Sequence, residues 1–247
     1  MTEVAPAVTE DRLLGGRVRL RQPAVGYRAG LDAALLAAAS DARPGERVLD
    51  LGCGPGGVLH QAAARGPGAL FTGVERDPAA ATLARENLAV NGVPGEIVEA
   101  DVRAGFKPLA LAPFDLALCN PPFFDDPAAL RAPHPARTAA YMAEDGLQAW
   151  TAFLLKAVRE GGRIVVVHRA ERLADLLALL GAKAGSFAVR PVQPFADAPA
   201  KRVLVRAVKT GRAPLRLLPA LVLHARGGGH TPETDALLRG EAALSWD

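Results

Sequence analysis

Short apolar segments that suit buried strands alternate along this chain with longer segments that repeat apolar residues at helical spacing. We expect strands at 47–51 and 69–75, followed by helices at 58–65 and 79–91 respectively. Regular alternation of strand and helix specifies a parallel sheet, whose right-handed crossovers place helices on both faces. The pattern continues with strands at 96–99, 114–119 and 163–168 and with helices at 146–159 and 171–180.

The last two predicted strands, 187–193 and 202–209, leave no room for a helix between them, so they should pair antiparallel at the sheet edge. The expected fold is therefore α/β and Rossmann-like, with seven mostly parallel strands, a terminal antiparallel hairpin and helices on both faces. A chain of 247 residues suits one domain. Within it we expect an N-terminal arm and helix covering the site at 1–40, a catalytic core at 41–210 and a C-terminal extension at 211–247.

Composition excludes several classes of protein. Every apolar stretch is broken by Arg, Asp, Gly or Pro too soon to span a membrane, and the acidic, polar N-terminus does not resemble a secretion signal. The two cysteines, Cys53 and Cys119, are too few for a disulfide framework or a zinc site, so we expect no metal and a cytoplasmic location. A net charge of +3 permits a polyanionic partner without requiring one.

A glycine-rich loop, Asp50–Gly57, follows the first predicted strand and leads into a helix. Its glycines allow a tight turn and a close approach of backbone to ligand, and the helix N-terminus offers unpaired N–H groups. Glu75 closes the second predicted strand, at the spacing where an acid binds ribose hydroxyls. This pattern fits both NAD and S-adenosyl-L-methionine.

Two acids favour S-adenosylmethionine. Asp50 lies on the strand before the first glycine, where it can face a ligand ammonium but would repel a pyrophosphate. Asp101 ends the third predicted strand, where its carboxylate can accept a hydrogen bond from the adenine amine with Val102 beside the ring. The alternative for Asp101 is that it caps a turn.

The fourth predicted strand ends in Asn120-Pro121-Pro122-Phe123-Phe124. An exocyclic amine is a poor nucleophile because its lone pair is delocalised, so methylation needs acceptors that hold its hydrogens and aim its nitrogen. The Asn120 side-chain oxygen and the Pro121 carbonyl can do both, and Phe123 or Phe124 can stack on a flipped-out base. The alternative is an Asn-Pro turn followed by core aromatics.

The arm before the first strand carries Gly30 and Asp32, where Asp32 could cap the next helix or, with Gly30, place the arm against the cofactor. The proline-rich stretch 124–137 is interpreted as an active-site loop. Its His134 lacks a metal partner at ligand spacing, and Trp150 is expected on the core face of its helix.

Asp-x-Gly-x-Gly, followed by acids that close the second and third strands, resembles the class I S-adenosylmethionine-dependent methyltransferases. That resemblance implies that the cofactor becomes S-adenosyl-L-homocysteine after transfer. It places Asp50, Gly52, Cys53 and Gly54 at the methionine moiety, Glu75 with Arg76 at the ribose, and Asp101 with Val102 at the adenine. Asn120 is expected to contact the cofactor as well as the acceptor amine. Asn-Pro-Pro-aromatic resembles the signature of amino methyltransferases that act on adenine, cytosine or a glutamine amide.

From about Leu13 to Gly240 the chain resembles the bacterial adenine-N6 methyltransferases that modify the nucleotide beside the anticodon of a valine tRNA. The resemblance implies an RNA substrate, with Arg137 and Arg169 as the cations expected to flank the mouth of the site; further cations that could contact RNA are Arg131, Arg172, Lys201 and Arg202.

Three different functions compete with this hypothesis. The first is methylation of a glutamine amide in a translation factor. Such enzymes usually carry a helical N-terminal domain, for which about 40 residues are too few. The second is a cofactor-binding protein without catalysis, which an intact Asn-Pro-Pro-Phe segment argues against. The third is an NAD-dependent oxidoreductase, which Asp50 disfavours.

Overall fold

A computed structural model describes residues 7–25, 28–122 and 146–247. Its main sheet runs in the order β5 (Gly95–Glu99), β4 (Leu70–Glu75), β3 (Arg47–Leu51), β6 (Phe114–Cys119), β7 (Val158–Arg169), β9 (Arg202–Lys209) and β8 (Ala184–Gln193). The first five strands in this order are parallel, whereas β9 is antiparallel to both β7 and β8. The predicted parallel sheet with an antiparallel hairpin is therefore confirmed. Two short strands, β10 (Arg216–Leu217) and β11 (Leu221–Val222), pair in parallel with β8 and extend the sheet beyond the seven predicted strands.

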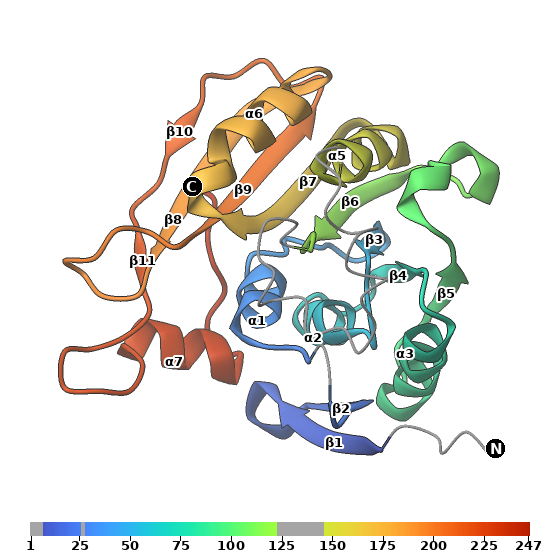
Figure 1. Cartoon of the computed structure of the whole chain (residues 1–247), viewed down its shortest axis with the longest axis horizontal. Coiled ribbons are helices and arrows are strands. Elements are labelled where there is room, and N and C mark those ends of the chain that lie inside the picture. The colour runs from blue at the N-terminus through green and yellow to red at the C-terminus, as the bar shows by residue number, and fades with distance from the viewer. Residues whose placement is uncertain (1–6, 26–27, 123–145) are drawn as a thin grey trace.

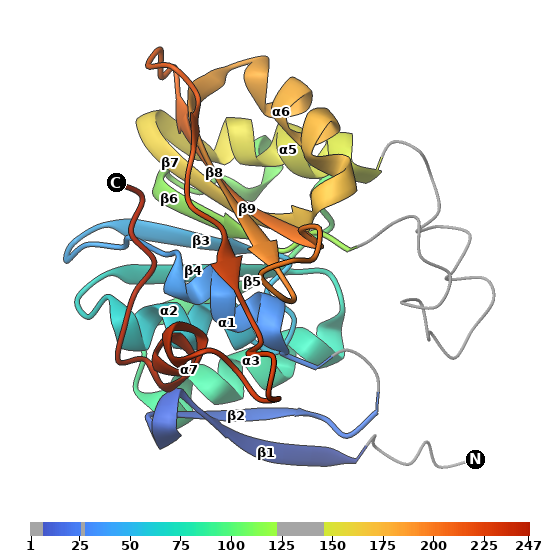
Figure 2. The same cartoon turned by 90° about the vertical axis from the view of Figure 1, so that its left-hand side faces the viewer.

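Helices cover both faces of the sheet. Figures 1 and 2 show α1 (Leu31–Ala38), α2 (Gly57–Arg65) and α3 (Pro78–Asn91) on one side, and α5 (Gly146–Ala157) and α6 (Leu173–Gly181) on the other. Each layer of helices encloses its own apolar core. Leu36, Leu59 and Leu116 belong to the first core, and Leu49, Phe153 and Val166 to the second. The consecutive residues Val48 and Leu49 of β3 thus face opposite layers, as in a strand buried on both faces.

The start of β7 differs from the prediction. The helix was expected to continue to Arg159, but α5 ends at Ala157 and β7 begins at once with Val158. Phe114 pairs with Val158 and Leu116 with Arg163, so the register between β6 and β7 shifts at this point. Between these two pairs β7 contains more residues than β6, and Gly161 is one of them. Its φ of 72° is left-handed, a conformation that glycine tolerates.

The N-terminal arm contains a two-stranded ribbon that was not predicted. It consists of β1 (Val8–Leu13) and β2 (Val18–Pro23), which pair antiparallel and lie outside α2 and α3 (Figure 2). The ribbon is attached to α3 by two asparagine amides: Asn91 bonds to both the N–H and the carbonyl of Arg19, and Asn87 does the same with Arg21. Asn87 also donates to the carbonyl of Pro55 in the glycine loop, at 2.9 Å.

The C-terminal residues pack on the first helical layer. α7 (Pro232–Arg239) is capped by Thr231 and lies against α1. The segment after it forms two hydrogen bonds to the end of α1: the Leu244 N–H donates to the Ala38 carbonyl, and the Trp246 indole N–H donates to the Ala39 carbonyl at 2.8 Å. Trp246 is buried, so this segment closes the first core.

One ion-pair network joins β7 to the turn before β3. The guanidinium of Arg163, only 12% exposed, lies 2.9 Å from Asp41 and 2.6 Å from Glu46. We expect Arg163→Met to lower the free energy of unfolding by about 3 kcal/mol, because it leaves the largely buried Glu46 carboxylate without a cation and leaves Asp41 only the more distant Arg206, at 3.5 Å. Arg159→Met is the matched control. Arg159 lies on the same strand and pairs with Asp115 at 2.6 Å, but it is 51% exposed, so its loss should cost about 1 kcal/mol or less. Urea denaturation measures both, and equal losses would contradict the prediction.

Candidate cofactor and amine site

The glycine-rich loop joins β3 to α2 and lies at the carboxyl edge of the sheet. Gly52, Gly54 and Gly56 have φ values of 73°, 54° and 92°, a region that side chains with a Cβ rarely adopt. The N–H groups of Gly52 and Cys53 donate to the Val74 carbonyl at 2.8 and 3.1 Å, which fixes the loop against the end of β4. The left-handed glycines thus shape a turn whose backbone leads into the N-terminus of α2.

Asp50 is more deeply buried than the sequence suggested. Asp50 is only 1% exposed, and its Oδ2 atom accepts a hydrogen bond from the Leu59 N–H at 3.0 Å. Burial raises the pKa of Asp50 to about 7; the Leu59 hydrogen bond opposes this shift, and the charge of Glu75 adds to it. Asp50 therefore holds the first turn of α2 against the glycine loop and can change protonation near neutral pH.

Glu75 also acts on the backbone. Its Oε2 atom accepts from the Gly54 N–H at 2.9 Å, and its Oε1 atom accepts from the N–H groups of Arg76 and Asp77 at 2.8 Å. A carboxylate that holds three N–H groups is fixed in place, yet Oε2, which accepts only one of them, keeps acceptor capacity for a further donor. This arrangement fits the predicted contact with ribose hydroxyls, which stays a prediction.

Asp101 has the capping role that was one of the two considered for it. It caps the 3-10 turn η2 (Val102–Ala104) by accepting from the Arg103 N–H, and its carboxylate also binds the Arg103 guanidinium at 2.7 Å. The side-chain hydrogen bond from Arg103 is the main cause that lowers the pKa of Asp101 to about 2. Arg76 lies 3.7 Å from the same carboxylate, and Val102 packs on the second core. The capping alternative is thus present, while the adenine contact stays untested.

The Asn-Pro-Pro segment lies beside the glycine loop. Leu51 of β3 pairs with Cys119 of β6, so Asn120 and Gly52, the residues that follow them, leave the sheet side by side. Pro121 is buried, and Asn120 and Pro122 are partly exposed. The predicted base-stacking residues Phe123 and Phe124 and the cations Arg131 and Arg137 lie outside the described residues, as does His134.

The arm reaches the same edge through Ala29, whose Cβ lies against Gly57 at the start of α2; a Cβ on Gly57 would approach it to 2.4 Å. Gly30 precedes α1 as its N-cap residue. Of the two alternatives for Asp32, helix capping is not what the structure has, since Asp32 lies within the first turn of α1. Its carboxylate pairs with Arg202 of β9 at 3.1 Å, and the contact with the cofactor stays a prediction.

Three of the described cations that were expected to contact RNA pair with acids. Arg169 lies 2.6 Å from Glu171, Arg172 lies 2.7 Å from Asp175, and Arg202 pairs with Asp32. The pairs of Arg169 and Arg172, whose acids are more than half exposed, contribute little to stability. Sequence patterns could not reveal the Arg202–Asp32 pair, because it joins residues 170 positions apart.

Sequence reasoning underestimated Trp150. Its indole packs partly on the second core, as expected, but the ring also reaches the glycine loop: a Cβ on Gly52 would lie 2.3 Å from the Trp150 Cη2 atom. In the sequence, this contact was indicated only by the position of Trp150 on the predicted helix 146–159, which follows the Asn-Pro-Pro loop.

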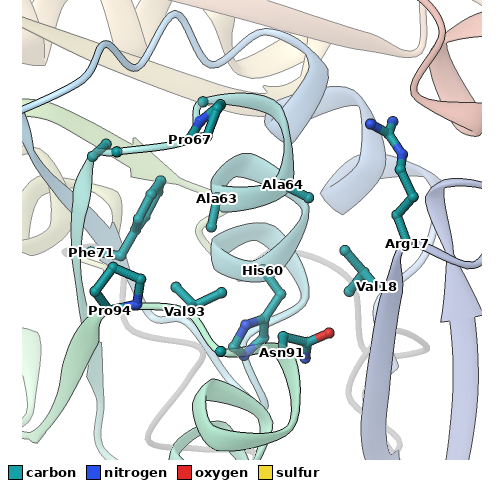
Figure 3. A pocket seen from close by; sticks show the side chains of 14 residues that line it. Arg17, Val18, His60, Ala63, Ala64, Pro67, Phe71, Asn91, Val93 and Pro94 are labelled. Carbon is teal, nitrogen blue, oxygen red and sulfur yellow. The ribbon is translucent and has the colours of Figure 1, made fainter.

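A cavity of about 370 Å³ lies at the opposite, amino edge of the sheet (Figure 3). It is bounded by the ribbon, the end of α2 and the α3–β5 turn, and its lining is mostly apolar, with His60 at one wall. Burial lowers the pKa of His60 to about 4, so this side chain is neutral at neutral pH. The cavity is separate from the site at the carboxyl edge.

Membrane spans and metal clusters are both absent from the part of the chain that the structure describes. No helix within residues 7–25, 28–122 and 146–247 is long and apolar enough to cross a membrane. In the same ranges, no cluster of three or more His, Cys, Asp or Glu side chains is placed to hold a metal ion.

The sheet order, the glycine loop after β3 and the acids that close β4 and β5 define the S-adenosylmethionine-dependent methyltransferases of class I. Residues 21–174 match the methyltransferase small domain, and the chain belongs to this family.

Similar proteins act on different acceptors. Release factor glutamine methyltransferase from Deinococcus radiodurans is 32% identical over 174 residues, which cover 67% of this chain and 59% of that protein. A tRNA1(Val) (adenine(37)-N6)-methyltransferase from Dickeya chrysanthemi is 32% identical over 199 residues, covering 77% of this chain and 76% of that protein. Among solved structures, protein Atu636 from Agrobacterium tumefaciens, a predicted O-methyltransferase, superposes with a TM-score of 0.72 at 28% identity over 86% of this chain and 98% of that one.

Proposed function

We propose that this methyltransferase acts on the exocyclic N6 amine of adenine in RNA, and specifically in tRNA near the anticodon. The observation that carries this proposal is the pairing of Leu51 with Cys119, which brings Asn120 out of the sheet beside Gly52. An amine acceptor held at Asn120 would therefore lie next to the glycine loop. We place the reaction in the cytoplasm, where tRNA is modified in bacteria.

The residues at the carboxyl edge fit S-adenosylmethionine. Three left-handed glycines at one turn allow backbone to approach a ligand, and Asp50, Glu75 and Asp101 lie at or just beyond the carboxyl ends of β3, β4 and β5. We assign the methionine moiety to Gly30, Asp32, Asp50, Gly52, Cys53 and Gly54, the ribose to Glu75 and Arg76, and the adenine to Asp101 and Val102. Bound there, S-adenosylmethionine supplies an electrophilic methyl group on a sulfonium.

Asn120 and Pro121 position the acceptor. The Asn120 side-chain oxygen and the Pro121 carbonyl accept the two hydrogens of the target amine, which turns its nitrogen towards the methyl group. A nitrogen–carbon bond forms as the sulfur–carbon bond breaks, and the amine then loses a proton to solvent. Catalysis by this arrangement comes mainly from positioning, with Phe123 stacking on the flipped base and Arg137 and Arg169 contacting phosphates.

A glutamine amide in a translation factor is the second candidate, because the same acceptors can hold an amide nitrogen and a release factor methylase is among the relatives. RNA is favoured by the tRNA methylase from Dickeya chrysanthemi, which aligns over about three quarters of both chains.

In the test, wild-type enzyme and S-adenosylmethionine with a labelled methyl group are incubated with unmodified bacterial tRNA and, in a separate reaction, with release factors. Label in tRNA that digests to N6-methyladenosine supports the proposal. Label in release factors alone moves the assignment to the glutamine amide. Label in neither, although calorimetry detects binding of S-adenosylhomocysteine, contradicts both acceptors and leaves the cofactor assignment standing.

A further inference from the structure

Trp150 is placed to do more than fill the core. Its ring is partly exposed, and the Cη2 and Cζ3 atoms at its far edge lie closest to the glycine loop. A Cβ on Gly52 would come within 2.3 Å of the first atom and 2.6 Å of the second, distances that real Cβ atoms do not show. Gly52 therefore has no side chain partly because the indole occupies that space.

The contact between Trp150 and Gly52 lies at the part of the proposed site that is assigned to the methionine moiety. Gly52 leaves β3 beside Asn120, at the methionine end. On the other side, α5 packs against η2, so Trp150 and Val102 both border the second core. Trp150 thus lies on the helix that packs against η2, the turn that contains Val102, while its ring reaches the glycine loop.

We propose that Trp150 is a cofactor-positioning residue whose indole forms a wall of the S-adenosylmethionine site. This inference rests on the proposed placement of the cofactor at the glycine loop. The ring edge against Gly52 holds the loop in shape, and the partly exposed remainder of the ring offers an apolar surface to the bound nucleoside.

Tryptophan fluorescence tests this placement directly. The chain has two tryptophans, and Trp246 is buried in the C-terminal segment, where it bonds to Ala39. In Trp246→Phe, excitation at long wavelength reports Trp150 alone. Titration with S-adenosylhomocysteine should then change its emission and saturate at the dissociation constant that calorimetry measures. In Trp150→Phe, the emission of Trp246 should stay constant.

The outcomes separate this inference from the proposed function. Calorimetric binding without any change in Trp150 emission overturns the inference while the cofactor assignment stands. A change that appears only in the Trp246 signal also overturns it. No binding heat in the wild-type chain contradicts the cofactor assignment and the inference together.

A double-mutant cycle tests the contact with Gly52. Gly52→Ala and Trp150→Ala should each weaken binding of S-adenosylhomocysteine by about tenfold, but the double variant should bind about tenfold better than independent effects would give, because the smaller side chain removes the clash. Gly56→Ala is the matched control: its φ is also positive, but its Cβ would meet His60 at 2.7 Å rather than Trp150. Combined with Trp150→Ala, it should be additive to within about twofold. Equal coupling at both glycines would overturn the contact.

Discussion

Replacement of Asn120 by alanine is expected to lower the rate of methyl transfer by about 10²–10³-fold, because it removes one of the two acceptors that aim the target amine. Asn120 lies beyond the end of β6, and the hydrogen bonds that hold Gly52, Gly54 and Asp50 go to other residues. The affinity for S-adenosylhomocysteine should therefore fall by less than about tenfold, far less than the rate. Single-turnover transfer to tRNA measures the rate, and calorimetry measures the affinity.

Asn91→Ala provides the control for this substitution. Asn91 lies at the far end of α3 and bonds to Arg19 of the ribbon, so its loss should reduce stability but not the single-turnover rate. If Asn120→Ala kept more than a tenth of the wild-type rate, the positioning role of Asn120 would be wrong.

The affinity for S-adenosylmethionine should rise about tenfold between pH 6 and pH 8. The pKa of Asp50, about 7, means that much of this carboxyl is protonated at pH 6, whereas a cationic ligand favours its ionised form. Asp50→Asn should bind more weakly at pH 8 and lose this dependence. Calorimetry across the pH range measures both, and Asp115→Asn, at the opposite edge of the sheet, should keep the wild-type profile. A pH dependence that survives in Asp50→Asn would contradict the role of this carboxyl.

Ionisation of Asp50 should lower the stability of the fold, although it should raise the affinity for S-adenosylmethionine. Because the pKa of Asp50 is raised in the folded chain, its contribution to stability is fully present below pH 3.8 and is lost as pH rises towards 7, at a cost of about 4 kcal/mol. The lowered pKa values of His60 and His168, both about 4, produce the reverse trend between pH 4 and 6.5. Comparison of urea denaturation between wild type and Asp50→Asn cancels the histidine contribution, since both chains carry it.

The sequence predicted those elements whose signals are local. The strand 114–119 and the strand 202–209 match β6 and β9, because each is an apolar run bounded by turn residues. The ribbon was missed because β1 is mostly exposed and carries Glu10, Asp11 and Arg12 in succession, while the alternation in β2 is short, with only Val18 and Leu20 as buried apolar residues. Their stability depends on Asn87 and Asn91, more than 60 residues away, and such a contact leaves no periodic signal in the strands themselves.

The site was predictable as a set of positions but not as a set of contacts. The glycine loop and the acids at 50, 75 and 101 lie at one edge of the sheet, since parallel strands end together. Their hydrogen bonds to backbone N–H groups depend on atoms that a motif does not specify. Glu75 accepts from Gly54, and Asp50 accepts from Leu59. Trp150 was assigned to packing alone, because helical spacing identifies the buried face of a helix but not which loop its ring touches.

The two asparagines of α3 also decide how the ribbon is aligned. Arg19 and Arg21 are two residues apart on a strand, a separation of about 6.7 Å, and Asn87 and Asn91 are four residues apart on a helix, a separation of about 6.0 Å. Because these two repeats nearly coincide, each amide meets one strand residue and forms both backbone hydrogen bonds, as a neighbouring strand would. Slippage of the ribbon by one residue would break all four bonds at once. A helix here takes the place of a third strand, and it shields the free edge of β2 from pairing with another chain.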